Sequence, residues 1–163
     1  MSLLEKLARW CAVLAGLLLT AITLMTCVSL IGRNTTGWTL VGDFELSGSA
    51  AGAAIALFLP WCQVRRGHIM VDFFTARAGA ATRMGLDRFG ALLLAGVMAL
   101  MAWRTGIGGV NAWNSQAGSM MLGFPEWIVY AGMVPPLALT ALIAALQAWR
   151  GFGDEGAEVR ATA

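Results

Sequence analysis

The chain has 163 residues, of which 58% are hydrophobic and 12% charged, and its formal net charge is only +2. A soluble domain carries ~25% charged residues and, at this length, has too little interior to hide so many apolar side chains. The composition therefore indicates a membrane protein. The positive residues are dispersed, which excludes a basic stripe for nucleic acid. The single histidine excludes paired axial haem ligands and a histidine-rich metal site.

Runs without charge predict four transmembrane helices, because a bilayer core of ~30 Å needs about 20 helical residues. The predicted spans cover, in chain order, residues 10–32, 46–64, 86–107 and 127–149. The first run is longer than a signal-peptide core of ~7–15 residues, so we expect a retained helix. The third reaches full length only if Arg104 lies near one interface and snorkels. We therefore expect an all-α integral membrane domain over residues 1–150, followed by a flexible cytoplasmic tail over 151–163.

The segment between the second and third spans is itself apolar. Residues 68–74 (HIMVDFF) contain one acid, and Ile69 and Phe73 are four residues apart. This pattern predicts a short interfacial helix on the cytoplasmic surface. A plain loop leading into the third span is the alternative.

The positive charges predict the orientation. With four spans, the termini and the middle loop share one side of the membrane, and that side receives nine of the eleven basic residues. The positive-inside rule then places both termini in the cytoplasm. The seven tryptophans all fall at or beyond predicted span ends, as an aromatic belt requires. The nine basic residues are Lys6, Arg9, Arg65, Arg66, Arg77, Arg83, Arg88, Arg150 and Arg160.

Small residues and prolines mark the helix surfaces. Gly48 and Gly52 form a G-x-x-x-G pattern with Ala56 one turn on, which favours close approach of another helix. Pro60 lies near the end of the second span, and Pro135–Pro136 lie inside the fourth. Prolines in these positions remove backbone donors and predict kinks.

No catalytic or transport chemistry is visible inside the predicted spans. A channel or proton-coupled carrier normally has ionisable groups at mid-bilayer depth. Here Glu45 lies beside Asp43 at the outer end of the second span, and Glu126 lies at the outer start of the fourth. There is no phosphate-binding loop, no serine with histidine and aspartate in register, and no C-x-x-C spacing. We expect no enzyme activity, no cofactor and no metal.

Two interpretations stay open for Arg33 at the outer end of the first span. It either snorkels to the interface as a helix terminus, or it pairs with Glu45 or Asp43 and fastens the first outer loop.

Further alternatives concern the cytoplasmic side. His68, beside Arg65 and Arg66, is either an interfacial residue or a proton relay. Asp72 pairs either with a nearby arginine or with a partner chain.

Three stretches together resemble a known family. Arg33 and Trp38 precede Glu45–Leu46 at the start of the second span, V-R-R-G-H-I-x-V-D follows that span at 64–72, and L-G-F-P-E-W opens the fourth at 122–127. Over roughly residues 10–149 the chain is similar to the small membrane subunit (DctQ type, small permease) of tripartite ATP-independent periplasmic (TRAP) transporters. Pro136 departs from that pattern, where a glycine is expected soon after Pro135.

The resemblance implies a function that the composition does not show. TRAP systems of the bacterial inner membrane import organic acids with a sodium gradient. A soluble periplasmic protein captures the substrate, and a large membrane subunit carries the substrate and sodium sites. The small subunit is expected to brace the large subunit and to help dock the periplasmic protein. On this hypothesis its partners are those two proteins and the lipid bilayer.

The candidate residues are then structural or partner-interface residues rather than ligands of substrate. The alternative hypothesis is a self-sufficient four-helix transporter or channel that works as a homo-oligomer. The candidates are Arg33, Glu45, Gly48, Gly52, Arg65, Arg66, His68, Asp72, Pro125 and Glu126.

Overall fold

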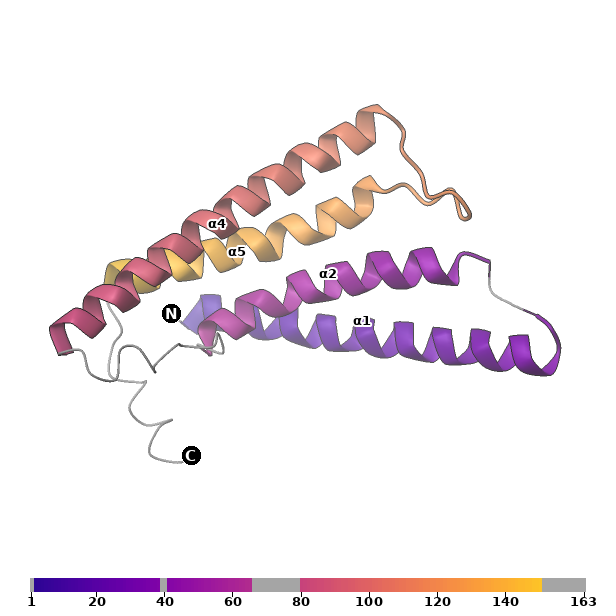
Figure 1. Cartoon of the computed structure of the whole chain (residues 1–163), viewed down its shortest axis with the longest axis horizontal. Coiled ribbons are helices and arrows are strands. Elements are labelled where there is room, and N and C mark those ends of the chain that lie inside the picture. Colours follow the sequence, from indigo (N-terminus) through magenta and orange to yellow (C-terminus); the bar gives the residue numbers. More distant parts are fainter. Residues whose placement is uncertain (1, 39–40, 66–79, 151–163) are drawn as a thin grey trace.

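The computed structural model describes residues 2–38, 41–65 and 80–150, and nearly all of them are helical (Figure 1). All four helices are long and apolar enough to cross a membrane, which confirms the all-α prediction with four candidate spans. The predicted interfacial helix at 68–74 and the tail at 151–163 lie outside the described residues. The helices are α1 (Ser2–Thr35), α2 (Asp43–Val64), α4 (Ala80–Asn114) and α5 (Trp127–Arg150).

Charges and hydroxyl groups suit the helices in which they occur. Glu5 lies in the first turn of α1, and Asp43 and Glu45 lie in the first turn of α2, where a helix dipole favours negative charge. The threonine hydroxyls of α1 donate to the carbonyl four residues earlier at 2.8–2.9 Å, as for Thr20 and Thr26. These bonds satisfy polar groups that would otherwise face lipid.

Two helices are longer than the spans predicted from charge-free runs. α1 begins at Ser2 rather than near residue 10, and α4 continues to Asn114 rather than ending near residue 107. Backbone hydrogen bonding continues where hydropathy falls, so a charged turn does not end a helix. As a consequence, Arg104 lies well inside α4 and not at its end.

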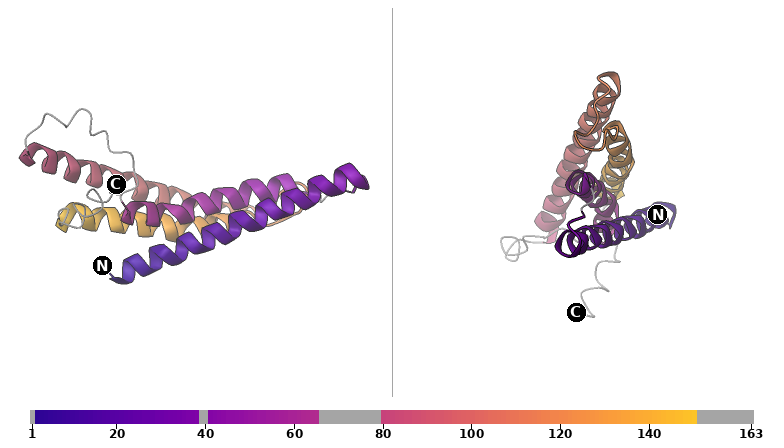
Figure 2. Two further views of the ribbon diagram at one scale, coloured as in Figure 1. Left: turned by 90° about the horizontal axis from the view of Figure 1, so that it is seen from below. Right: turned by 90° about the vertical axis from the view of Figure 1, so that its right-hand side faces the viewer.

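The four helices form one bent layer in the order α1, α2, α5, α4 (Figure 2). α1 packs along α2, α2 along α5, and α5 along α4, with only a small contact between α1 and α5. In Figure 1 the α1–α2 pair diverges from the α4–α5 pair toward the end that carries residues 36–38 and 115–126, which we call the loop end. α1 and α4 begin, and α2 and α5 end, at the opposite end, which we call the terminal end.

The helices meet through small side chains and expose their large ones. Most buried apolar residues are alanines, among them Ala54 and Ala144, which have no exposed surface. In an apolar 18-residue window of each span, 6% of the residues of α1 and of α4 are buried, against 22% for α2 and 28% for α5. Small residues let helices approach closely in lipid, where the removal of apolar surface from water does not drive helices together. The large outward side chains therefore face lipid or partner chains.

The prolines lie inside continuous helices. Pro60 is within α2, and Pro135 and Pro136 are within α5. One carbonyl near the second pair is used by a side chain, since the Thr140 hydroxyl donates to the Pro136 carbonyl at 2.8 Å. Thr140 and Pro60 are the largest fully buried side chains among the described residues.

Candidate functional site

The loop at 115–126 is fastened onto the start of α2 at the loop end. Both carboxylate oxygens of Glu45 accept a hydrogen bond from the backbone N–H of Met121, at 3.3 and 3.2 Å. Beside this contact, Gly42 has a φ of +82°, and a Cβ there would lie 2.5 Å from two side-chain carbons of Leu122. Glycine is therefore required at position 42 both by the backbone conformation and by the close approach of the loop.

The loop has its own hydrogen-bonded structure. The Ser119 N–H donates to the Phe124 carbonyl at 2.9 Å, and the Glu126 N–H donates to the Ala117 carbonyl at 3.1 Å. Gly118 and Pro125 form an isolated antiparallel bridge between these two bonds. The sequence predicted interface roles for Pro125 and Glu126, and in the structure they are the last two residues of this loop, directly before α5.

The two acids at the start of α2 use partners other than Arg33. The Ser29 hydroxyl of α1 donates to Asp43 at 2.6 Å, and Ser29 is only 3% exposed. Glu45 is bound by the loop amide of Met121. Within the described ranges neither acid pairs with Arg33, which is exposed in the last turn of α1. Of the two interpretations of Arg33, the structure therefore supports the exposed helix terminus.

A recess of about 540 Å³ opens between α2, the loop and the start of α5. Its lining residues include the acids Glu45 and Glu126, Ser49 and several apolar residues. Phe44, Met120 and Phe124 at its rim are exposed to 86%, 100% and 36%. The loop end therefore presents an apolar rim around an acidic recess.

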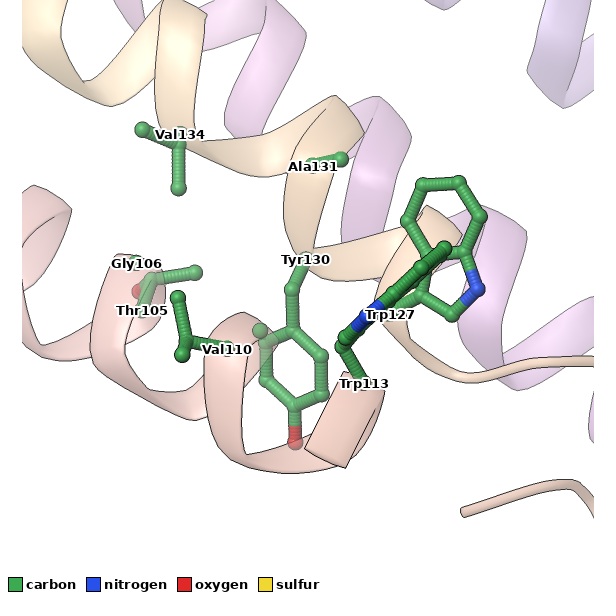
Figure 3. Close-up of a pocket in the computed structure, with 9 residues that line it drawn as sticks. Thr105, Gly106, Val110, Trp113, Trp127, Tyr130, Ala131 and Val134 are labelled. Carbon is green, nitrogen blue, oxygen red and sulfur yellow. The ribbon is translucent and has the colours of Figure 1, made fainter. Parts of the chain in front are cut away.

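A second cavity of about 290 Å³ lies between α4 and α5 (Figure 3). Trp113 and Trp127 meet edge to face there, with ring centroids 4.8 Å apart and an interplanar angle of 78°. Its lining contains no charged side chain, and its side-chain polar groups are the hydroxyls of Thr105 and Tyr130 and the two indole N–H groups. The lining residues are Thr105, Gly106, Gly109, Val110, Trp113, Trp127, Tyr130, Ala131 and Val134.

The closest glycine contacts between helices lie where the sequence reading did not place them. A Cβ at Gly109 would lie 3.0 Å from the Cβ of Tyr130, and one at Gly108 would lie 3.3 Å from the Tyr130 ring. In the predicted G-x-x-x-G pair, a Cβ at Gly52 would lie 3.7 Å from the Cε atom of Met133 in α5, while a Cβ at Gly48 would meet nothing within 4 Å. The run G-x-G-G at 106–109 was the available signal, but small-residue spacing does not reveal which face meets a partner.

A buried pair of glutamines joins α2 to α5 near the terminal end. The Gln63 side chain donates to the Gln147 amide oxygen at 2.8 Å, and Gln147 donates to the Gln63 carbonyl at 3.3 Å. Both residues are at least nine-tenths buried. The Gln63 amide oxygen has no partner among the described residues. The sequence reading missed this pair, although uncharged amides inside apolar helices are the groups expected to bond across helices.

Other candidates lie at or beyond the end of α2. The Arg65 guanidinium lies 5.0 Å from the centroid of the Trp61 ring, a cation–π contact. Arg66, His68 and Asp72 lie outside the described residues. In the ranges that are described, no three His, Cys, Asp or Glu side chains cluster in a way that could hold a metal ion.

Arg104 differs most from its predicted place. The contacts of Gly109 with Tyr130 and of Gly106 with Val134 set the register of α4 against α5, and they put Arg104 level with Pro136. It lies about 15 Å along the axis from the end of α4 at Asn114, at ~1.5 Å per residue. The predicted span ended near residue 107, whereas the apolar helix continues to Asn114, so Arg104 is an exposed residue well inside the candidate span Arg88–Asn114.

Comparison with known proteins identifies the family of the chain. A family model described as "Tripartite ATP-independent periplasmic transporters, DctQ component" matches residues 22–154. No curated protein and no solved structure gave a significant match. The match includes α2, the loop at 115–126 and α5 in full. The chain therefore belongs to the DctQ family, the small-subunit component of TRAP transporters, a non-catalytic family of transport proteins.

Proposed function

We propose that this chain is the scaffold of a sodium-driven TRAP transporter that imports organic acids across a bacterial inner membrane. In this role it braces the large membrane subunit and helps to dock the periplasmic substrate-binding protein. Family membership makes it one component of a three-part system. The sodium coupling, the organic-acid substrate and the docking role are the parts that we add.

One observation carries the proposal: the described helices have no carboxylate inside their spans. Glu5, Asp43 and Glu45 lie in first helical turns, Asp87 directly precedes the candidate span Arg88–Asn114 of α4, and Glu126 precedes α5. A chain that moved sodium or protons by itself would need acidic groups at depth. The ion-coupling chemistry is therefore expected in another subunit, and this chain has the helices and the exposed apolar surface of a support.

The docking role is supported by the loop end. Glu45 and Gly42 hold the 115–126 loop against α2, so that the rim around Phe44 and Met120 is presented on a supported surface. An exposed apolar rim around a recess lined by two acids is a contact surface that suits a soluble partner. We place this end in the periplasm, because nine of the eleven basic residues lie in the termini and the middle loop.

Coexpression with a large TRAP subunit tests the proposal. The two chains should copurify through a tag on either one, and proteoliposomes should take up substrate only when both chains and the binding protein are present. Uptake by proteoliposomes that contain this chain alone would support the alternative of a homo-oligomeric transporter or channel. Failure to copurify with any large TRAP subunit would contradict the scaffold role.

A further inference from the structure

The side of α4 that does not pack against α5 carries one arginine within an otherwise uncharged stripe. Its residues recur at alternating intervals of four and three, which places them on one helix face. All six are exposed. The stripe, which we call the Arg104 stripe, consists of Leu93, Val97, Leu100, Arg104, Ile107 and Asn111.

The opposite side of α4 is already used. Ala91, Ala95 and Ala112 are 7–8% exposed, and Gly109 meets Tyr130 of α5. Ala91, Ala95 and Gly109 each lie two positions from a residue of the Arg104 stripe, which is roughly 200° around a helix. The Arg104 side chain is therefore left exposed on the side of α4 that the contact with α5 does not cover.

The depth of Arg104 is what requires a partner. It lies ten residues, or about 15 Å, inside the nearer end of the candidate span Arg88–Asn114, and it is level with Pro136 within the candidate span of α5. An arginine side chain is too short to bring its guanidinium to the headgroups from that depth without deforming the bilayer. Ionisable residues inside membrane spans almost always face a protein interior or an aqueous cavity and pair with another group. Within the described part of the chain, Arg104 has no acidic neighbour.

A second copy of this chain does not supply the missing group. All nine acids of the sequence lie at or outside the ends of the four candidate spans. Two copies packed through the Arg104 stripe would instead bring two arginines to similar depth. The complementary surface must belong to a different membrane protein that has a carboxylate within a span.

We propose that the Arg104 stripe packs against a helix of the large TRAP subunit and that Arg104 pairs there with an aspartate or glutamate at mid-membrane depth. This inference rests on the proposed function, because it names the surface that the scaffold turns toward its partner. Arginine suits such a site, since its planar guanidinium binds a carboxylate through two parallel hydrogen bonds.

The first test uses charge reversal in the full chain coexpressed with the large subunit. Arg104→Glu should lower the recovered large subunit by about tenfold or more, because it places two negative charges together away from water. Arg9→Glu is the matched control, since it makes the same charge change at an exposed site near the terminal end of α1. Combining Arg104→Glu with a change of one membrane-span acid of the large subunit to arginine should restore recovery for one such acid.

The second test does not depend on how the charge variant folds. In a chain without its native cysteines, Leu100→Cys and Ile107→Cys should cross-link to cysteines placed in spans of the large subunit. Ala95→Cys, on the face that packs against α5, should not.

The outcomes separate this inference from the proposed function. If the unmodified chains do not copurify, the scaffold role itself fails. If they do copurify, but Arg104→Glu is recovered as well as the control or neither stripe cysteine cross-links, the scaffold role stands and the Arg104 interface is overturned. Unchanged recovery together with dependence on anionic lipid would assign Arg104 to a lipid phosphate, which also overturns the inference.

Discussion

Glu45 shows how one side chain can join two distant parts of the chain. Its carboxylate lies in the first turn of α2 and binds a backbone amide 76 residues later, in the loop that precedes α5. A hydrogen bond to an ionised acceptor is stronger than a hydrogen bond to a neutral one. The charge of Glu45, and not only its shape, is therefore expected to hold the loop.

We predict that Glu45→Gln weakens this attachment, because the amide oxygen is a weaker acceptor than the carboxylate. Hydrogen exchange at the Met121 amide should become faster, while exchange in the middle of α4 should not change. The exchanged pair Arg33→Glu with Glu45→Arg should not restore protection, because Arg33 is not the partner of Glu45 in the structure. Recovery by that double variant would show that the ion pair forms after all.

Gln63 and Gln147 are coupled polar residues in the contact between α2 and α5. Gln147→Leu leaves the buried Gln63 amide without its partner, and Gln63→Leu leaves the Gln147 amide oxygen without its donor, so we expect each variant to lose about 1–3 kcal/mol in the free energy of unfolding. The double leucine variant should lose less than the sum of the two single losses, because no unpaired amide remains. Denaturation in detergent, followed by circular dichroism, gives the free energies of unfolding of the unmodified chain, the two single variants and the double variant. Strict additivity would contradict the coupling.

Among the elements, α4 has two faces with different tasks. One face is made of alanine and glycine and lies against α5, and the other is the exposed Arg104 stripe. Hydropathy alone does not distinguish them, because both are apolar except for Arg104 and Asn111. The difference lies in side-chain size, which decides how near a second helix can come.

We predict that Gly109→Leu separates α4 from α5, because even a Cβ at this position would lie 3.0 Å from the Cβ of Tyr130. Overpacking of this kind costs about 1–3 kcal/mol. Thermal unfolding should begin at a lower temperature, and the near-ultraviolet dichroism from the Trp113–Trp127 edge contact should weaken.

Gly96→Leu is the matched control, because Gly96 is exposed on the same helix with nothing within 4 Å of an added Cβ. Leucine is also the better helix former, so this variant should be at least as stable as the unmodified chain. Equal losses in the two variants would mean that the Tyr130 contact does not set the distance between α4 and α5.

In the whole molecule, the single-layer arrangement leaves most of the apolar surface uncovered. A closed bundle would bury one face of every helix, but here α1 and α4 lie at the edges of the layer, and only 6% of the residues in an apolar 18-residue window of each are buried. Such a layer offers a broad side surface to other membrane helices, as a supporting subunit requires. The two ends of the layer differ in charge, which is the basis of the proposed orientation.

Chemical labelling tests this orientation in chains without native cysteines. Met120→Cys, at a fully exposed position of the loop end, should react with a membrane-impermeant maleimide in intact cells whose outer membrane admits the reagent. Leu3→Cys, at the 71% exposed start of α1, should react only after the inner membrane is opened. The reverse pattern would place the termini in the periplasm and contradict the positive-inside assignment.

The amino-acid sequence alone determined the membrane class, the number of long apolar helices and the family. These properties depend on composition, on runs without charge and on short motifs, all of which are local along the chain. The four helices therefore appear at the predicted places, although charge-free runs underestimated α1 and α4 because helical hydrogen bonding continues through charged turns.

Only the tertiary structure decided which residues meet. It joined Glu45 to Met121, paired Gln63 with Gln147, and put the closest glycine contact at Gly109 rather than at Gly48. It also left Arg104 exposed well inside its candidate span. Contacts of this kind depend on the register and rotation of one helix against another. Those are set by side-chain packing between segments far apart in the sequence, and no local pattern in this chain encodes them.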